Sequence, residues 1–335
     1  LETARRLRCA QRRVRYDIVQ LNSTFDLKAL LRDLTVVLSL RRDGRKIVLK
    51  FHGSEAKLIQ TENPLLRLLM MTLFACVDAV GVLSTEERQN LIEAGVDPAK
   101  VFVVKNILNP SLYQSDPGFH SRWGLDPEVP VLLYAARFIP GKGVLDAVRT
   151  CGLLAQRGER FVLICAGDGP EREAAQAEAR RLGVQARVRF TGYVAEEQMR
   201  ELYANATLLL FPTFYDEGFP MVVFQSVAAG LPVVTTRLRG SADYLREYDN
   251  CLWTEPHNPS LSADRVQVLL RHPDLRASMA SANRKLALGF VADKVAAEYD
   301  ALYRHLLFAT HDGEGLEDDN RERDLVSGKR LEPAS

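Results

Sequence analysis

A loop near the middle of the chain combines two cations with a glycine turn. Arg137 and Lys142 lie in the stretch ARFIPGKG, residues 136–143, between a predicted strand and a predicted helix. Cations beside the unpaired N–H groups of a helix start make a suitable site for phosphates. The G-x-x-x-x-G-K-[ST] spacing of a P-loop is absent. Taken alone, the segment fits two surface cations on a turn equally well.

A second loop, FYDEGFPMVVFQSVAAGLPVV at 214–234, carries an acid and an amide around a helix start. Pro220 suits the first helical turn. Glu217 can accept hydrogen bonds from hydroxyl groups, and the amide of Gln225 can pair with a vicinal diol. Backbone contacts to a ligand are expected from Gly218, Phe219, Pro220, Met221 and Val222. An ordinary capped helix is the alternative for this stretch alone. Together with the cationic loop, it suggests a diphosphate with polyol groups on both ends, which is the chemistry of a nucleotide sugar.

Two further strand ends carry candidate residues. His52 follows a predicted strand at 46–51, where a histidine can donate to a ligand or carry a proton. Taken alone, this position favours a structural histidine. The stretch CAGDGP at 165–170 matches half of a G-x-G-x-x-G fingerprint, but Arg172 replaces the third glycine. It predicts a tight turn into a helix that starts at Pro170, rather than a dinucleotide site.

The elements that must position these loops alternate between short β-branched runs and longer helical segments. The predicted strands are 17–21, 46–51, 79–83, 101–104, 131–136, 161–166, 187–191, 207–211 and 232–235. Continuous apolar strands that alternate with helices are typical of parallel sheets covered on both faces. We therefore predict an α/β protein with two doubly wound, Rossmann-like domains. A ligand is expected in the cleft between them, at the carboxyl ends of the strands.

A stretch rich in Pro, Asn, Asp and Ser at 105–130 separates four predicted strands from five, which predicts a linker near 106–112. We expect an acceptor-side domain at 1–108, a donor-binding domain at 109–292, a C-terminal helix at 293–309 that could cross back, and a disordered acidic tail at 310–335. Local signals predict several helix ends. They are Asn63-Pro64 and Ser84-x-x-Glu87 as N-terminal caps and Gly95 as a C-terminal stop.

Composition narrows the class of protein. The chain has 335 residues, enough for two domains with substantial cores, and a net charge of +1 gives no reason to expect a nucleic-acid partner. The five cysteines are scattered without a C-x-x-C pair, and Cys76 and Cys165 lie in apolar runs. This pattern predicts reduced cysteines and a cytoplasmic location. The longest apolar stretch, 65–77, is too short to span a bilayer.

The two ends of the chain have uneven charge. Arg5, Arg8, Arg12 and Arg15 share one face of a predicted helix. This face fits either a solvated surface, which is favoured, or loose attachment to the inner face of the cytoplasmic membrane. Because residue 1 is Leu and lies within this predicted helix, we expect the start to be a cut.

The order of short motifs along the chain resembles a known family. The motifs are FHG at 51–53, the segment 84–106, ARFIPGKG at 136–143, AGDGP at 166–170, FTGYV at 190–194, EGFP at 217–220 and AGLPVV at 229–234. This series is similar to the retaining GT-B glycosyltransferases of the family 4 type, also called glycosyl transferases group 1. The resemblance implies that Arg137 and Lys142 hold the donor diphosphate and that Glu217 contacts the donor sugar. It also implies that His52 lies near the sugar.

The chain departs from that family in two places. Gln225 stands where the family has a second glutamate that binds the ribose hydroxyls, which should weaken donor binding by on the order of 1 kcal/mol. The family's first strand and its glycine-rich loop have no counterpart in the sequence. We expect either a fragment or a shortened relative, and whether such a shortened chain is active stays open.

These observations predict an enzyme that transfers a hexosyl group from a nucleotide sugar to a glycan, glycolipid or small acceptor, with retention of anomeric configuration. His52, Glu217, Arg137 and Lys142 are the predicted catalytic residues. No cofactor or obligatory metal is expected, because the cations can stabilise the leaving diphosphate. The alternatives are a non-catalytic nucleotide-sugar-binding or scaffold protein and an epimerase or phosphorylase. A nicotinamide dehydrogenase comes last, because no strand is followed by a complete glycine fingerprint. The donor, the acceptor and the pathway stay open.

Overall fold

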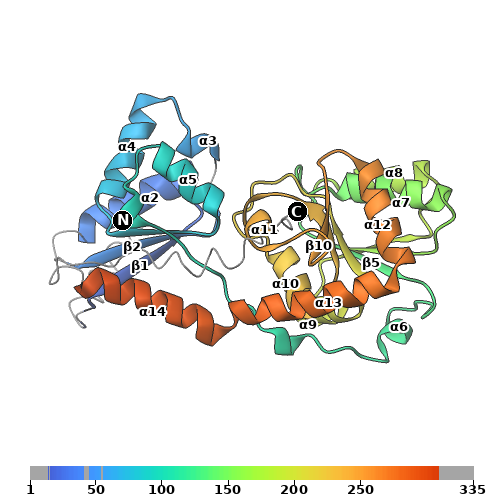
Figure 1. Cartoon of the computed structure of the whole chain (residues 1–335). Coiled ribbons are helices and arrows are strands. Elements are labelled where there is room, and N and C mark those ends of the chain that lie inside the picture. The colour runs from blue at the N-terminus through green and yellow to red at the C-terminus, as the bar shows by residue number, and fades with distance from the viewer. Residues whose placement is uncertain (1–13, 15, 41–44, 54–55, 309–335) are drawn as a thin grey trace, which may run out of the picture.

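The computed structural model describes residues 14, 16–40, 45–53 and 56–308, and in this part the chain forms two parallel sheets (Figure 1). The first sheet has the order β1-β2-β3-β4 and the second the order β10-β9-β8-β5-β6-β7. The predicted α/β class with two doubly wound sheets is therefore confirmed. The arginine-rich face (Arg5, Arg8, Arg12 and Arg15) and the predicted acidic tail at 310–335 lie outside the described residues.

All nine predicted apolar runs form strands, with ends shifted by at most two residues, and the structure has a tenth strand in its described part. They are β1 (Ile18–Ser23), β2 (Lys46–Phe51), β3 (Ala79–Val82), β4 (Val101–Val103), β5 (Val131–Ala135), β6 (Val162–Ala166), β7 (Val188–Gly192), β8 (Leu208–Phe211), β9 (Val233–Thr236) and β10 (Cys251–Thr254). Strand β10 was missed. Its sequence, CLWT, lacks a continuous aliphatic run, and it becomes a strand by pairing with β9 at the sheet edge.

The helices follow or connect these strands. They are α2 (Leu27–Leu40), α3 (Ala56–Ile59), α4 (Pro64–Ala75), α5 (Thr85–Glu93), α6 (Phe119–Arg122), α7 (Val144–Gln156), α8 (Arg172–Arg181), α9 (Glu196–Asn205), α10 (Met221–Ala229), α11 (Arg239–Tyr244), α12 (Pro259–Arg271), α13 (Pro273–Ala287) and α14 (Ala292–Phe308). The predicted caps are confirmed. Asn63 accepts from the N–H groups of the first turn of α4, Ser84 accepts from Glu87, and Gly95 follows α5 in the left-handed region with φ of +101°.

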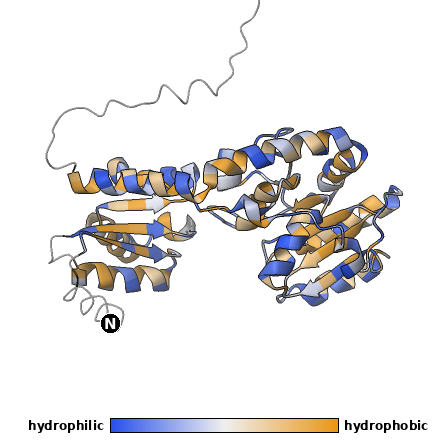
Figure 2. Cartoon of the chain, turned by 90° about the horizontal axis from the view of Figure 1, so that it is seen from below, coloured by the Kyte–Doolittle hydropathy of each residue, from blue (hydrophilic) through white to orange (hydrophobic). Residues whose placement is uncertain are grey.

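The two faces of the first sheet are covered by different parts of the chain. Ile47 and Leu49 of β2 are buried with the apolar side chains of α2 and α4. Val48, on the other face, belongs to the same buried cluster as Leu302 and Leu306 of α14. Figures 1 and 2 show α14 running along this second face of the sheet. The C-terminal helix therefore completes the core of the first half of the molecule.

Polar contacts also tie α14 to the first sheet. Glu298 pairs with Lys105 at 2.5 Å, and the Tyr303 hydroxyl donates to Oε1 of Gln20 on β1 at 2.6 Å. The chain thus crosses between the two sheets twice, before β5 and again before α14. The crossings lie side by side, since the N–H of Leu108 donates to the carbonyl of Phe290 at 2.8 Å.

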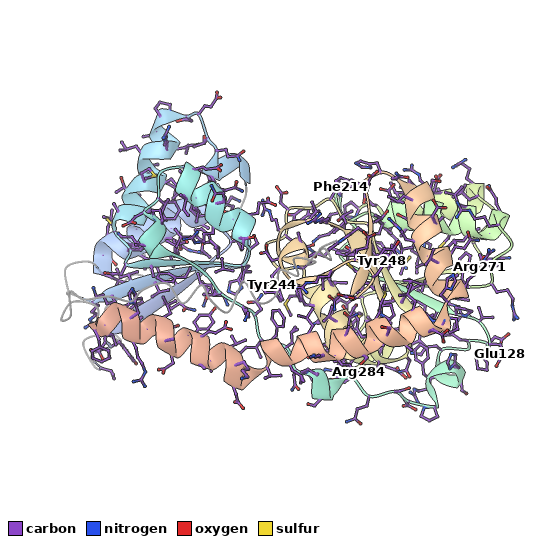
Figure 3. The ribbon with its side chains drawn as sticks, viewed as in Figure 1. Glu128, Phe214, Tyr244, Tyr248, Arg271 and Arg284 are labelled. Carbon is purple, nitrogen blue, oxygen red and sulfur yellow. The ribbon has the colours of Figure 1, made fainter. Side chains whose placement is uncertain are left out.

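An aromatic cluster supports these crossings on the side of the second sheet. Tyr244, which lies on the side of this half nearest the first sheet (Figure 3), has its ring centroid 5.0 Å from that of Phe290. Phe219 and Phe224 stack at 3.6 Å and contact the same two rings. Within the described ranges, every helix is too short or too polar to span a membrane.

Candidate active site

The two loops that sequence analysis singled out in the second sheet are interlocked. We call residues 137–143 the cation loop and residues 212–220 the acid loop. The N–H of Phe214 and the hydroxyl of Thr213 both donate to the carbonyl of Gly141, at 2.7 and 3.1 Å. Gly143 has φ of +82°, and a Cβ there would lie 2.2 Å from the carbonyl oxygen of Pro212. Only glycine fits this close approach, so the two loops form one unit.

This unit brings Lys142 and Glu217 into an ion pair. The ammonium group of Lys142 contacts Oε1 of Glu217, and the exposed fractions of the two side chains are 10% and 21%. The ammonium also lies 4.4 Å from the ring centroid of Tyr215, and the hydroxyl of the buried Tyr134 donates to the backbone carbonyl of Lys142 at 3.0 Å. Such a shielded pair interacts more strongly than a surface pair. A cation and an acid are therefore held together at the same point.

Arg137 projects from the start of the cation loop. Its side chain is exposed and makes no hydrogen bond or ion pair with any other residue that the structure describes. The backbone beside it is held firmly, because the N–H of Phe138 donates to the carbonyl of Asp168 and its carbonyl accepts from Glu171, at 2.8 and 2.9 Å. An exposed guanidinium on a fixed backbone can bind an anion with little rearrangement.

The glycines of the AGDGP stretch have a structural function. A Cβ on Gly167 would lie 1.8 Å from the carbonyl oxygen of Ala136, and one on Gly169 would lie 2.5 Å from that of Phe138. The stretch is a tight turn that supports the cation loop, as the sequence analysis favoured. The following helix begins at Arg172 rather than at Pro170, because residues 170 and 171 form a turn.

The acid loop leads directly into the N-terminus of α10. Gly218, Phe219 and Pro220 are buried, Met221 and Val222 are half-buried, and Pro220 is the residue immediately before the helix. The first N–H groups of a helix have no intrahelical partner and carry a partial positive charge. Gln225, also half-buried, forms no side-chain hydrogen bond with the other described residues. Its amide is available to a ligand.

His52 lies on the first sheet, at the carboxyl end of β2. Its ring Nε2 is 3.3 Å from Oδ1 of Asn22. Burial, followed by the positive charge of Lys50, lowers the pKa of His52 below its ordinary value and so favours the neutral imidazole. No hydrogen bond or ion pair between described residues joins His52 to Lys142 or Glu217.

A chain of polar contacts nevertheless connects β2 to the start of α10. The ammonium of Lys50 donates to Oδ1 of Asn106 at 3.1 Å, and the amide of Asn106 lies 3.8 Å from the sulfur of Met221. Lys50 also lies 5.3 Å from the ring centroid of Tyr299 on α14. The strand that ends at His52 is thus connected through the crossing segment to the helix that follows Glu217.

Two residues at the junction of the halves were not assigned to the site from the sequence. Glu87 was recognised only as part of a helix cap, yet its carboxylate is fully buried against Gly218, where a Cβ would lie 2.5 Å from its Oε2. Arg239, at the start of α11, is 3% exposed and lies beside it. The sequence signal for Glu87 was its place in the Ser84-x-x-Glu87 cap, whereas the sequence around Arg239 gave no signal. In the described part of the chain, no group of three or more His, Cys, Asp or Glu side chains is arranged to hold a metal ion.

Comparisons with known proteins agree with this architecture. The profile of glycosyl transferases group 1 matches residues 117–286, half of the chain, and that of Glycosyltransferase Family 4 matches residues 1–112. The chain is 30% identical over 235 residues to the D-inositol 3-phosphate glycosyltransferase of Acidothermus cellulolyticus, which covers 67% of this chain and 52% of that protein. The chain spans about half the length of the curated relatives it matches.

Solved structures share the fold. Sucrose-phosphate synthase from Thermosynechococcus elongatus superposes with a TM-score of 0.76 at 20% identity, covering 92% of this chain and 78% of that one. Anabaena HepE, solved in complex with UDP, gives a TM-score of 0.75 at 20% identity, and the match covers 90% of this chain and 81% of HepE. Identities at this level show the fold alone, and that fold is GT-B. With its profile match and its two facing sheets, the chain belongs to the glycosyl transferases group 1 family.

Proposed function

We propose that the protein transfers a hexosyl group from a nucleotide sugar to a glycan, glycolipid or small acceptor with retention of anomeric configuration. The observation that carries the proposal is the union of Lys142, Glu217 and the N-terminus of α10 in one interlocked unit. This unit lies where the second sheet meets the first, since Gly218 touches Glu87. A diphosphate and a sugar ring need those groups side by side.

Each residue has a role that its surroundings support. Arg137 and Lys142 bind the two phosphates of the donor, and the first turn of α10 adds backbone N–H groups. Glu217 accepts hydrogen bonds from the sugar hydroxyls, while Gln225 pairs with the ribose. As the bond between sugar and phosphate breaks, negative charge grows on the leaving diphosphate, and these cations and dipoles stabilise it.

His52 contributes from the opposite side. With its pKa held down by burial and Lys50, the neutral ring can both donate and accept a hydrogen bond. We assign it to the donor sugar, near the reacting carbon. Closure of the two halves about residues 106–112 would bring His52 to the sugar and exclude water, so that the acceptor is glycosylated in place of water.

The proposal divides the chain into residues 1–108 on the acceptor side, 109–292 on the donor side, and the helix 293–309 that packs on the first sheet. The relatives suggest where to begin with ligands. HepE has been solved with UDP-glucose bound, and another relative is named for D-inositol 3-phosphate. A UDP-hexose is therefore the first donor to test, and a phosphorylated polyol is the first acceptor.

The test is calorimetry with UDP-, GDP- and ADP-sugars and with NAD. One nucleotide sugar should bind the parent tightly, and Arg137→Ala should weaken it about tenfold or more, because a charge-assisted contact to phosphate is lost. Arg160→Ala is the matched control. Arg160 is also an exposed arginine, but it precedes β6 at the amino end of the parallel strands, whereas Arg137 follows the carboxyl end of the neighbouring β5.

A second candidate is a binding protein that holds a nucleotide sugar without turning it over. Gln225, a neutral group facing the ribose, favours it, because a carboxylate would bind a diol more strongly. Tight donor binding without release of nucleotide in the presence of acceptors would support this candidate. Equal binding by the parent and Arg137→Ala, or no binding of any nucleotide sugar, would contradict both.

A further inference from the structure

A second buried charge cluster joins the two halves of the molecule, and the transferase role proposed above does not use it. We propose that Arg239 is a positioning residue that ties α5 of the first half to the acid loop and so holds Glu217 in place for the donor sugar. The inference rests on the proposed function for its effect on turnover. The tie itself concerns two protein surfaces and can be measured without any donor.

The backbone at Arg239 is in an unusual conformation. Its φ is +35°, in the left-handed region that residues other than glycine rarely adopt. Non-glycine residues persist there when the surrounding contacts determine their position, and such sites are concentrated where function requires them. The side chain is 3% exposed, so a guanidinium charge has been taken almost entirely out of water. A charge buried to this degree requires partners.

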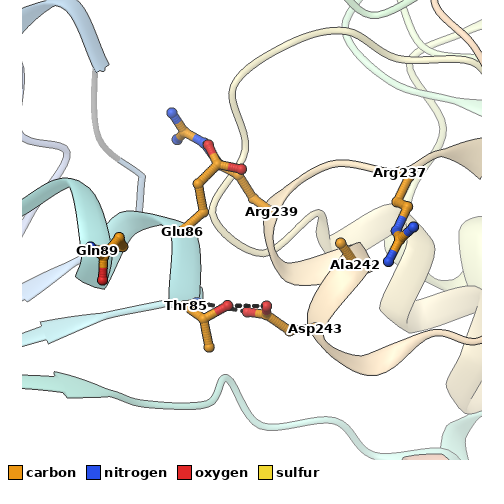
Figure 4. A pocket seen from close by; sticks show the side chains of 7 residues that line it. All are labelled: Thr85, Glu86, Gln89, Arg237, Arg239, Ala242 and Asp243. Carbon is orange, nitrogen blue, oxygen red and sulfur yellow. Dashed lines mark hydrogen bonds and ion pairs between the residues drawn. The ribbon is translucent and has the colours of Figure 1, made fainter.

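Its partners come from both halves of the molecule. Nε of Arg239 is 3.3 Å from Oε1 of Glu86, and Nη1 is 3.6 Å from Oε1 of Glu87, both in the first turn of α5. Nη2 is 3.6 Å from Oδ2 of Asp216, the residue before Glu217. Figure 4 shows Arg239 reaching from α11 to Glu86 on α5. One guanidinium therefore serves two acids of the first half and one acid of the acid loop.

Close backbone contacts surround this cluster. The N–H of Gly240 donates to the carbonyl of Gly218 at 3.0 Å, and a Cβ on Gly240 would lie 2.3 Å from that oxygen. Gly218 in turn lies against Glu87. Three segments, α5, the acid loop and the start of α11, thus meet where neither glycine can carry a side chain. A shift of α5 away from α11 would remove the contact of Glu87 with Gly218, next to Glu217.

A neighbouring contact also holds α5 against α11. Asp243 of α11 accepts hydrogen bonds from the N–H of Thr85, at 2.7 Å, and from its hydroxyl (Figure 4). These groups line a pocket of about 450 Å³ that also contains Arg237. Glu86 and Asp216 are more than half exposed, whereas Glu87 and Arg239 are sealed. The buried pair of Glu87 and Arg239 therefore forms the centre of this contact between the halves, and the exposed acids Glu86 and Asp216 lie around it.

The test compares Arg239→Met with Arg239→Lys, Glu87→Gln and the matched control Arg237→Met. Arg237 lines the same pocket but is exposed and makes no ion pair with other described residues. Three quantities are measured on the full chain: the affinity for UDP, the turnover of the nucleotide sugar that binds the parent, and the radius of gyration from small-angle scattering without ligand. Circular dichroism checks that each variant is folded.

Arg239→Met should lower kcat at least tenfold while the dissociation constant of UDP stays within about twofold, because Arg137 and Lys142 are untouched. Its radius of gyration should rise. Glu87→Gln should change kcat and size in the same direction by a smaller factor, Arg239→Lys should restore part of both, and Arg237→Met should match the parent. A structural effect alone would instead lower UDP affinity together with kcat, as in Arg137→Ala.

An unchanged radius of gyration in both Arg239→Met and Glu87→Gln overturns the tie. Unchanged kcat in a variant that has opened overturns the positioning role. If the parent neither binds nor turns over nucleotide sugars, the proposed function fails, and the scattering comparison still decides whether Arg239 holds the halves together.

Discussion

The substitution Glu217→Gln should have opposite effects on two ligands that differ only in the sugar. In the ligand-free protein Lys142 is 10% exposed and its carboxylate partner is Glu217. A diphosphate must therefore draw the ammonium away from this acid. Glutamine keeps the shape of the side chain and removes the competing charge. We expect a nucleoside diphosphate without sugar to bind more tightly to the variant than to the parent.

The size of the effects on UDP binding and on turnover can be worked out from the Lys142–Glu217 ion pair. Hydrogen bonds to charged groups contribute about 1.5–3 kcal/mol. In the parent, the contact of Lys142 with the phosphate replaces most of its lost interaction with Glu217. Removing the competing acid should therefore improve the free energy of UDP binding by about 1 kcal/mol, or about fivefold in affinity. For the nucleotide sugar, the variant loses a charge-assisted hydrogen bond to a sugar hydroxyl. A loss of about 1.5–3 kcal/mol in the transition state lowers kcat/KM by about tenfold to about 150-fold.

Calorimetry with UDP and steady-state kinetics with the matching UDP-sugar measure the two effects. Glu159→Gln is the control, because Glu159 has a side chain 14% exposed and pairs with Arg271 away from both loops. If Glu217→Gln weakens UDP and the UDP-sugar by the same factor, Glu217 does not distinguish the sugar from the phosphate. If turnover is unchanged, the assignment of Glu217 to the sugar is wrong.

Three further predictions concern single groups. Gln225→Glu should tighten donor binding by about 1 kcal/mol in calorimetry, because a carboxylate accepts hydrogen bonds from a diol more strongly than an amide does; weaker binding would contradict the ribose contact. Gly143→Ala should lower the melting temperature by several degrees, because its Cβ meets the carbonyl of Pro212 at 2.2 Å and φ is +82°; an unchanged value would mean that the loops are not interlocked in solution. Lys50→Met should raise the pKa of His52 in an NMR titration but leave it below 6.5, because burial is the larger cause of its depression. Since the folded pKa is the lower one, the contribution of His52 to stability is present above pH 6.5 and is lost as the pH falls through the folded value.

The fold was largely predictable because most of its strands are buried. A parallel strand covered on both faces is a continuous apolar run, and runs such as VLLYA of β5 and LLLF of β8 are unmistakable in the sequence. Strand β10, CLWT, has no unbroken aliphatic run of this kind, so pairing with β9 decides its structure. Cap signals at Asn63 and Ser84 were readable because the side chain and the N–H groups that it accepts from are neighbours in sequence.

The site was predictable only to the level of loops. Lys142 and Glu217 were assigned to one ligand from their chemistry, but their contact joins residues 75 positions apart and follows from the way Gly143 passes Pro212. Arg239 and Glu86 are 153 positions apart. Local patterns identify a cap or a turn at each end of such a pair, and only the tertiary packing of the loops and helices decides that they meet.

Under the proposed function, the same geometry would let the diphosphate and the sugar of a donor be recognised together. At rest the charges of Lys142 and Glu217 satisfy each other. A diphosphate that takes Lys142 leaves Glu217 without its cation, 21% exposed and beside Asp216. That acid then needs hydrogen-bond donors, and the hydroxyl groups of the attached sugar provide them. A nucleoside diphosphate alone provides none, so its binding leaves a carboxylate uncompensated. The parent should therefore prefer the nucleotide sugar to the bare nucleotide, and this preference should disappear in Glu217→Gln, where the amide carries no charge to compensate.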